Sequence, residues 1–121
     1  MHDIGEVLKS FDHPDEVREY ERMRLEIVHL RGQSFGRAIY EPGWRWSTHV
    51  GLPQGERWCR VEHLYCVVEG AAVAEFEDGS RTEVRAGSLH YVPPIPHDSR
   101  VLGNSRYVSL HFLGADQYAR K

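Results

Sequence analysis

The chain has 121 residues, with 15 lysines and arginines against 18 aspartates and glutamates and a formal net charge of −3. This length suits one domain with a core that needs no disulfides, and a chain without a basic run offers no surface for nucleic acid or an anionic membrane. No apolar stretch approaches the roughly 20 residues of a membrane span, and no signal-peptide pattern is present. We therefore expect a soluble cytoplasmic protein with free cysteines, in which the eight histidines are the unusual feature.

In chain order, the first predicted element is a short helix over about residues 14–22. Pro14 suits the first helical position, and the acidic residues after it favour the positive end of a helix dipole. From residue 23 onward the apolar runs are short and turn residues recur between them, which is typical of β-strands. The predicted strands are 23–30, 34–40, 44–49, 57–69, 71–77, 81–85, 88–92, 98–102 and 106–113.

So many strands with no second layer of helices indicate an all-β fold in which sheets pack on each other around a pocket. We expect an N-terminal segment with the short helix at 1–22, a β-barrel at 23–114 and a C-terminal tail at 115–121. An exposed strand edge near 23–40 favours a homodimer.

His63 lies on a predicted strand, where it shares a face with Tyr65 and Val67. A histidine among apolar neighbours needs partners for its ring nitrogens, and a metal ion is one such partner. Cys59 has the same parity as His63. Four residues of straight strand separate side chains by about 13 Å, so the two share a metal only if the chain turns between them. A core histidine beside a buried thiol is the alternative interpretation.

His97 follows the stiff segment 93–96, whose prolines prevent a sheet ladder. Such a loop can aim one imidazole, and Asp98 is placed to orient the ring through its other nitrogen. An exposed loop histidine is the alternative. His49 precedes a loop with glycine and proline near the mouth of the pocket, where it is either a ligand or a loop residue.

We assign no chemistry to the other five histidines. His111 falls on the outer face of the last strand, because the apolar residues at 108, 110 and 112 take the inner face. His90 lies on a strand without clean alternation, and we interpret it as structural. The remaining three are in the N-terminal region: His2, His13 and His29.

The residues from Trp44 to Gly70 resemble the first of the two short motifs of the cupin superfamily. In cupins this motif runs His-x-His, three or four residues, Glu, and six residues to a Gly. Counted back from Gly70, the Glu position is His63 and the second His position is Trp58 or Cys59. The second motif runs Gly, five residues, Pro and a His shortly after, which matches positions 87, 93 and 97.

More closely, the chain is similar to a subgroup of uncharacterised bacterial cupin-domain proteins that are small and have a single domain. The shared motifs cover nearly the whole chain: Pro14-Asp15-Glu16, Pro42 to Ser47, Cys59 with His63, Asp78-Gly79, Pro93 to Asp98, and Gly114-Ala115 with Tyr118-Ala119. The resemblance implies an all-β cupin-type double-stranded β-helix, a jelly-roll barrel, with the short N-terminal helix before it. It is specific for the fold and weak for the reaction, since the superfamily spans many activities.

The usual cupin metal site of three histidines and one glutamate does not transfer intact, because positions 56–59 lack the His-x-His and His63 replaces the glutamate. The resemblance implies a divalent metal ion bound by Cys59 in a former His position, His63 in the Glu position and His97 in the last His position. His49 or water is the fourth ligand. One thiolate with two or three imidazoles favours zinc, ahead of iron, copper or nickel.

These positions lead to one hypothesis and two alternatives. The first is a small metal-binding cupin that holds a small organic molecule in a pocket lined by Tyr65, Val67 and Trp46. With an open coordination position its metal would act as a Lewis acid, as in a dioxygenase, isomerase or lyase. The second is a non-catalytic module that senses a ligand or a metal. The third is a protein that only retains the fold. The sequence leaves open whether the chain is an enzyme.

Overall fold

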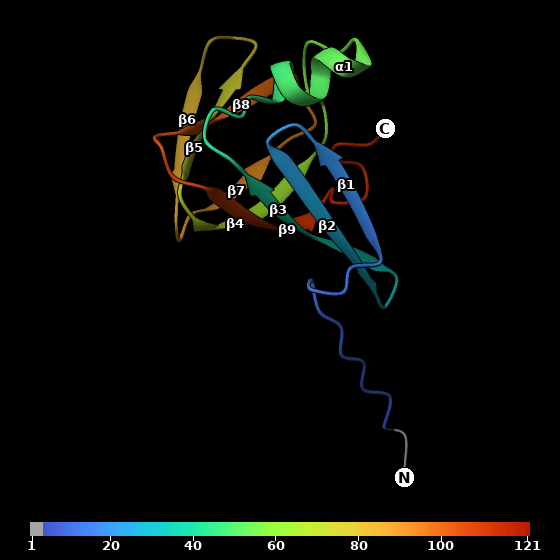
Figure 1. Ribbon diagram of the computed structural model, residues 1–121. Coiled ribbons are helices and arrows are strands. Elements are labelled where there is room, and N and C mark those ends of the chain that lie inside the picture. Colours follow the sequence, from blue (N-terminus) through green and yellow to red (C-terminus); the bar gives the residue numbers. More distant parts are fainter. Residues whose placement is uncertain (1–3) are drawn as a thin grey trace.

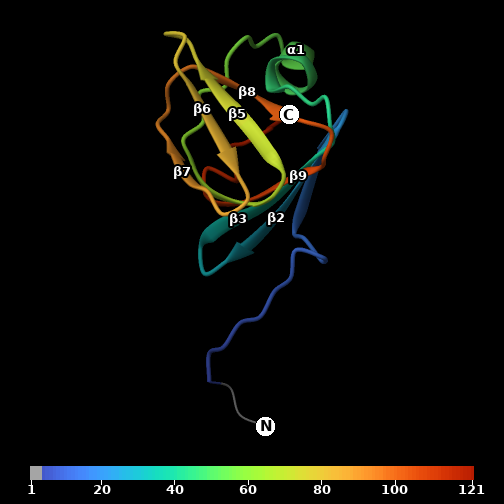
Figure 2. The same ribbon diagram turned by 90° about the vertical axis from the view of Figure 1, so that its left-hand side faces the viewer.

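The computed structural model describes residues 4–121, and most of its regular structure is β-strand. Two antiparallel sheets face each other, with a short helical segment at one end (Figures 1 and 2). Within these residues, no helix has the length and apolar character needed to cross a membrane. The strands are β1 (Glu16–Tyr20), β2 (Met23–Leu30), β3 (Gln33–Tyr40), β4 (His63–Glu69), β5 (Ala71–Phe76), β6 (Arg81–Arg85), β7 (Leu89–Val92), β8 (His97–Leu102) and β9 (Tyr107–Leu113).

The larger sheet has the strand order β1-β2-β3-β9-β4-β7. Strand β4 begins at His63, which lies opposite Val92 of β7. Two residues further, Tyr65 lies opposite His90 on β7 and opposite His111 on β9. This register gathers imidazole and phenol groups around the middle of the sheet.

The smaller sheet has the order β6-β5-β8, and β8 begins at His97. The outer edge of β8 is met by two single bridges, Arg45 to Arg100 and Cys59 to His97. These bridges bring the chain between β3 and β4 against the smaller sheet. Cys59 is thereby placed directly opposite His97.

The space between the sheets holds the core, and its centre is not purely apolar. Aliphatic and aromatic side chains from both sheets are buried there, with Leu25, Ile27 and Ala38 fully excluded from solvent. Histidine and serine side chains are buried among them: His63, His97, Ser109 and His111. The apolar core therefore surrounds a cluster of buried polar side chains.

The helical segment replaces the strand that we predicted at 44–49, so that prediction is wrong. Only Arg45 pairs as a strand, and a π-helical turn (Ser47–Gly51) and the one-turn α1 (Leu52–Gln54) follow it. The turn starts where the backbone N–H of Ser47 donates to the Asp98 carboxylate at 2.9 Å. A Cβ at Gly51 would overlap the Trp46 ring, so glycine allows this turn to pack over that indole.

The helix predicted over 14–22 is also wrong, because this segment contains β1. Strand β1 pairs along its whole length with β2, from Glu16 opposite Ile27 to Tyr20 opposite Met23. The backbone N–H and C=O groups that we expected to pair within a helix pair with β2 instead. Pairing with the free edge of β2 therefore outweighs the local capping pattern. The exposed edge predicted near 23–40 is wrong for the same reason, since β2 lies between β1 and β3. The homodimer stays a prediction.

Part of the C-terminal segment 115–121 packs against the core. Gly114 adopts a φ of +83° in close contact with the backbone of Glu62, a position that only glycine accepts readily. Beyond it Ala115 and Tyr118 are buried, and the Tyr118 hydroxyl lies 2.8 Å from that of Tyr40. The C-terminal segment therefore contributes a wall to the site described next.

Candidate metal centre

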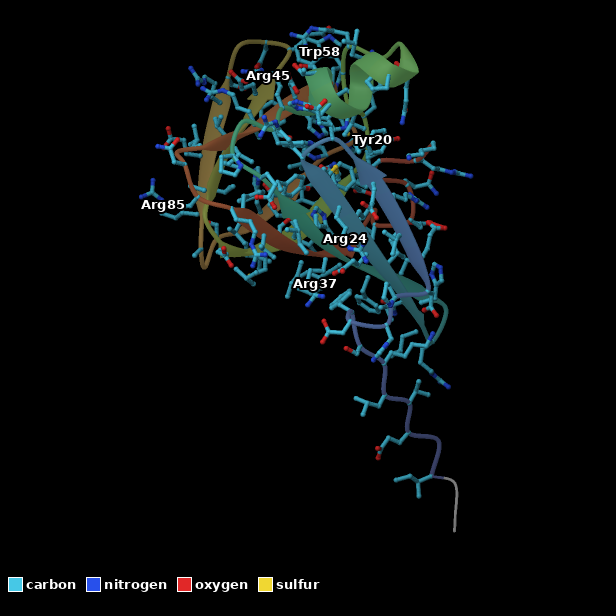
Figure 3. All side chains as sticks on the ribbon, in the orientation of Figure 1. Tyr20, Arg24, Arg37, Arg45, Trp58 and Arg85 are labelled. Carbon is cyan, nitrogen blue, oxygen red and sulfur yellow. The ribbon has the colours of Figure 1, made fainter. Side chains whose placement is uncertain are left out.

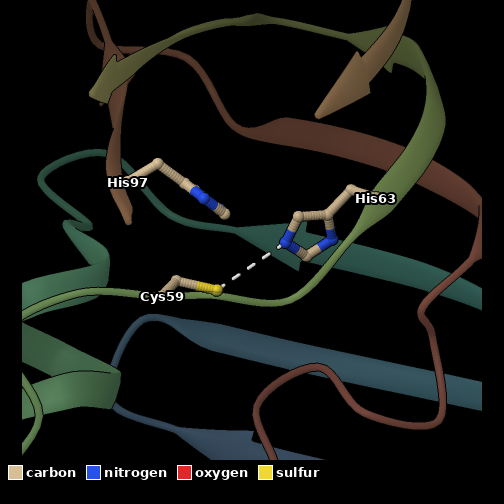
Figure 4. Close-up of side chains that lie close together, drawn as sticks. All are labelled: Cys59, His63 and His97. Carbon is tan, nitrogen blue, oxygen red and sulfur yellow. Dashed lines mark hydrogen bonds between the residues drawn. The ribbon is translucent and has the colours of Figure 1, made fainter. Parts of the chain in front are cut away.

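Cys59, His63 and His97 meet between the two sheets. Their ligand atoms all lie within 4.8 Å of one another, and all three side chains are buried. The Cys59 Sγ lies 3.7 Å from the His63 Nε2, with the His97 ring beside them (Figure 4). The sulfur of Cys59 and the nitrogen of His63 would lie about 3.5 Å apart if both bound one tetrahedral zinc ion, with bonds of about 2.3 and 2.0 Å.

Two reciprocal backbone hydrogen bonds fix Cys59 beside His97. The Cys59 N–H donates to the His97 carbonyl at 2.8 Å, and the His97 N–H donates to the Cys59 carbonyl at 3.0 Å. Residues 60–62 then cross between the sheets outside any strand, and β4 starts at His63. The chain therefore turns between Cys59 and His63, as a shared site requires.

The His97 ring is held through its Nδ1, which lies 2.8 Å from the backbone carbonyl of Ile95. The Nδ1 carries the proton in that bond, because a carbonyl only accepts, so Nε2 is left as the free electron-pair donor. The stiff proline segment supplies this carbonyl. Asp98, which we expected to orient the ring, instead binds Ser47 and Arg45.

The His63 ring has one nitrogen near sulfur and one without a hydrogen-bond partner. Its Nε2 faces Cys59, whereas its buried Nδ1 has no partner among the described residues. A histidine that binds a metal through Nε2 carries a proton on Nδ1, and that N–H usually meets an acceptor. The three side chains form a donor set that suits a metal ion. The unpaired Nδ1 fits a site that also takes up a ligand from outside the protein.

Burial sets the protonation of the three side chains. It lowers the pKa of His63 well below its usual value and lowers the pKa of His97 as well, so both rings are neutral near pH 7. It raises the pKa of the Cys59 thiol to about 12. Neutral imidazoles are ready to bind a metal, and the thiol must give up its proton when a metal binds.

A cavity of about 40 Å³ adjoins the three side chains. Two of the three residues expected to line the ligand pocket, Trp46 and Tyr65, do so, whereas Val67 is buried in the core outside this lining. His49 lies apart from the cavity. Its Nδ1 accepts the backbone N–H of Arg45 at 3.0 Å, and the structure does not bring it to the other three.

His111 belongs to the cavity wall, so the outer face that we predicted for it is wrong. It is 4% exposed, its Nε2 lies 2.9 Å from the Ser109 Oγ, and its ring stacks on Tyr65 with centroids 5.2 Å apart. The inner face of β9 is the polar one, carrying Tyr107, Ser109 and His111. The alternation misled us because the apolar residues of β9, at 108, 110 and 112, lie on the outer face of the sheet.

Phenol groups complete the wall. Tyr40 and Tyr118 share a hydrogen bond across it, and Tyr107 packs beside Tyr40 with centroids 5.1 Å apart. Burial raises the pKa of all these phenols, to about 12 for Tyr65, so they are neutral at physiological pH. His90 stands at the margin, half-buried, with its Nδ1 2.9 Å from the Tyr65 hydroxyl.

A second, more open hollow of about 270 Å³ lies outside the first and shares Trp46 and Cys59 with it. Its charged lining residues are Glu56, Arg60 and Arg120. Trp58, which also lines it, lies at the α1 end of the molecule (Figure 3). Trp46 and Cys59 thus lie between the cavity and this more open hollow.

No family model matches the chain, and no curated protein is significantly similar to it. Solved structures do match at low identity. A protein of unknown function from Vibrio parahaemolyticus matches with a TM-score of 0.60 and 15% identity, over 81% of this chain and 97% of that one. KdgF from a Halomonas species matches with a TM-score of 0.59 and 14% identity, over 88% of this chain and 90% of the other.

Oxalate decarboxylase from Lactobacillus farciminis, solved as a formate complex, matches with a TM-score of 0.57 and 16% identity. The match covers 82% of this chain and 30% of the decarboxylase. KdgF and oxalate decarboxylase are cupin-fold proteins, and identities this low show the shared fold alone. The chain therefore has the cupin fold that its motifs predicted, while membership of the uncharacterised subgroup stays a prediction.

Proposed function

We propose that this chain is a small metal-binding cupin in which Cys59, His63 and His97 hold one divalent ion. The observation that carries the proposal is the convergence of three buried ligand atoms within 4.8 Å, beside a cavity. Each side chain is fixed by a different device: a backbone bridge for Cys59, a carbonyl bond for His97 and a strand start for His63. Ligands held in this way lose little freedom when an ion binds.

Zinc is the leading candidate for the ion. One thiolate and two neutral imidazoles form a soft, nitrogen and sulfur donor set, which zinc accepts in tetrahedral geometry. Iron, copper and nickel accept similar sets and are the alternatives. The 3.7 Å between the Cys59 sulfur and the His63 nitrogen agrees with the spacing of two ligands of one zinc ion.

Within the part of the chain that the structure describes, the cluster contains three protein ligands. Three protein ligands with a fourth position left to water or substrate are typical of catalytic zinc sites, whereas structural sites use four. A bound ion with such a position would act as a Lewis acid toward an oxygen of a small ligand. The protein's own residues would orient that ligand, exclude water and supply hydrogen bonds from the phenol and imidazole wall.

The size of the cavity limits the ligand. Pockets for drug-sized ligands measure roughly 300–1,000 Å³, many times the 40 Å³ found here. Besides the ion, the cavity admits a molecule of a few heavy atoms. We therefore propose that the small-molecule ligand is much smaller than a drug-sized compound.

Zinc binding of the untagged protein tests the proposal. We expect about one zinc per chain by elemental analysis, and a stripped protein that takes up zinc against a competing chromophoric chelator. Cys59→Ala, His63→Ala and His97→Ala should each weaken zinc by about 100-fold or more, whereas His49→Ala should bind as the wild type does. Circular dichroism checks that each variant folds. Zinc affinity unchanged in all three ligand variants, or no zinc bound by the wild type, would overturn the proposal.

A further inference from the structure

The two sheets differ in the side chains on their outer faces. On the smaller sheet, β6 exposes Arg81, Glu83 and Arg85 to solvent, as expected of a sheet with one face in water. On the larger sheet, the outer positions of β4, β7 and β9 carry uncharged and mostly apolar side chains. We call the following six residues the apolar face: Leu64, Cys66, Leu89, Tyr91, Leu110 and Phe112.

The apolar face is continuous across three neighbouring strands. Cys66 of β4 lies opposite Leu89 on β7 and opposite Leu110 on β9. Cys66 alternates along β4 with Tyr65, which lines the cavity, so this row of three points away from the metal centre. Three members of the face are strongly exposed, by 70%, 51% and 43% for Leu89, Tyr91 and Phe112. Contiguous exposed apolar patches of this kind mark sites of interaction.

The charged residues at the margin of the apolar face are paired within the chain. Arg37, which lies opposite Leu110, binds the Glu26 carboxylate at 2.6 Å. Glu69, at the end of β4, binds Arg106 at 3.3 Å. An apolar centre with a polar margin is the usual composition of a protein–protein interface. A partner for this surface therefore needs apolar side chains more than it needs charge.

The N-terminal arm, which we define as residues 4–8, supplies such side chains. It extends away from both sheets (Figures 1 and 2). Its three large apolar residues are exposed by 73%, 50% and 90% at Ile4, Val7 and Leu8. Exposed apolar surface on an extended segment is costly in water. The arm and the apolar face are therefore both left exposed to solvent in a single copy of the chain.

The arm begins beside the apolar face. Lys9 and Phe11 line a hollow of about 330 Å³ together with Phe112, which also belongs to the apolar face. The Lys9 Nζ donates to the His29 carbonyl at 2.7 Å, which fixes the base of the arm to the larger sheet. Five extended residues span about 17 Å. The arm can therefore reach a second copy that docks on this side of the molecule.

The exposed apolar area is large enough for a stable dimer. A large apolar residue has roughly 150–200 Å² of surface, so the exposed fractions of the three arm residues and of Leu89, Tyr91 and Phe112 leave roughly 600–750 Å² on each chain. Two copies that covered each other would bury about 1,200–1,500 Å², within the range of specific interfaces.

We propose that the chain forms a homodimer in which the arm of each copy lies on the apolar face of the other. A second copy is the favoured partner because one chain carries both halves of the contact, on the same side of the molecule. A two-fold axis between the copies gives each apolar face the arm of the other. This surface replaces the strand edge near residues 23–40, which β1 covers, as the basis for a dimer.

Sedimentation of the untagged full chain, stripped of metal, tests the apolar face at about 1–100 µM. The wild type should be a dimer. Leu89→Glu places a charge within the apolar face and should weaken the dimer by about 100-fold or more. Leu52→Glu is the matched control, because Leu52 is a leucine with 72% exposure on α1, outside the larger sheet, and it should dimerise as the wild type does. Circular dichroism checks that each variant folds.

A second pair of variants tests the arm. Leu8→Glu should weaken the dimer by about tenfold or more, because it places a charge against the partner's apolar face. Leu8→Met keeps an apolar side chain and should leave the dimer intact. Leu8 lies outside both sheets, so this pair decides the proposal even if Leu89→Glu fails to fold.

Each outcome bears on a separate part of the proposal. A wild type that stays monomeric up to about 100 µM would overturn it, and the apolar surface would then belong to a different partner. A dimer unaffected by Leu89→Glu, or weakened equally by Leu52→Glu, rejects the apolar face as the interface. A dimer unaffected by Leu8→Glu rejects the exchange of arms. The measurements use stripped protein, so they hold whether or not the chain binds zinc.

Discussion

Two buried polar clusters begin at successive residues of β8, and they differ in how completely their atoms are paired. The Asp98 carboxylate accepts from the N–H groups of Ser47 and Ser99, from the Ser47 hydroxyl and from Arg45, at 2.7–3.0 Å. The cluster that includes His97 leaves four buried nitrogens without partners in the described chain. Complete pairing is what a structural cluster needs, whereas incomplete pairing is what a binding site leaves for its ligand.

The largest effect that we expect comes from breaking the paired cluster. Asp98→Ala should lower the free energy of unfolding by roughly 3 kcal/mol, because it leaves the partly buried N–H donors of Ser47 and Ser99 unpaired and removes one of the two carboxylates that pair with Arg45. Urea denaturation of stripped protein measures this. Asp78→Ala, at an exposed carboxylate bound to Ser80, should shift the midpoint far less. Similar shifts in both variants would contradict the assignment of Asp98 as a structural residue.

The buried histidines of the unpaired cluster should make the stability of the stripped protein depend on pH. Burial lowers the pKa of His111 to about 4 and lowers those of His63 and His97. The unfolded chain binds protons near pH 6.5 and the folded chain does not, so stability is complete above that pH and falls as the pH drops toward 4. His111 alone accounts for about 3 kcal/mol of this loss.

Denaturation of the stripped protein at pH 7, 6, 5 and 4 measures the effect, with His111→Phe as the comparison. The variant should lose part of the pH dependence. A wild-type midpoint that stays constant between pH 7 and 4, or a variant with the same slope as the wild type, would contradict a buried neutral His111.

A smaller effect is expected at pH 7. His111→Phe should change the stability of the stripped protein by only about 1 kcal/mol, because it removes a buried nitrogen that has no partner and also the hydrogen bond with the buried Ser109 hydroxyl, and these two changes oppose each other. If His111→Phe destabilises the protein as strongly as Asp98→Ala, the two clusters do not differ as we describe.

The smallest effect concerns His49, whose ring accepts a backbone N–H and stays outside the cavity. His49→Ala should change the free energy of unfolding by about 0.5 kcal/mol and leave zinc affinity as it is. Chelator competition and urea denaturation measure both quantities. A tenfold loss of zinc affinity would return His49 to the set of ligands.

Much of the fold could be predicted from the sequence, because short apolar runs between turn residues place strands from β2 to β9 within a few residues, apart from the late start of β4. The exceptions were decided by contacts distant in sequence. A capping pattern at residues 14–22 predicted a helix, and pairing with β2 made a strand there instead. The segment 44–49 has strand-like aromatic residues, but Asp98 and Gly51 turn it into a helical segment.

The candidate site was predictable where a motif spacing marked it. Cys59, His63 and His97 occupy the positions that the cupin motifs indicated, and the structure brings them together. His111 could not be found in this way. Alternation along a strand shows that polar and apolar residues lie on opposite faces, but it does not show which of the two faces points inward. Tyr118 was missed because its place depends on how the end of the chain packs across the sheets.

X-ray absorption of the zinc-loaded wild-type protein tests the central claim most directly, because it reads the atoms bound to the ion. The proposed centre predicts one sulfur at about 2.3 Å and two imidazole nitrogens at about 2.0–2.1 Å, with one lighter atom completing four ligands. A spectrum without sulfur, or with sulfur but without imidazole, would contradict the joint site of Cys59, His63 and His97.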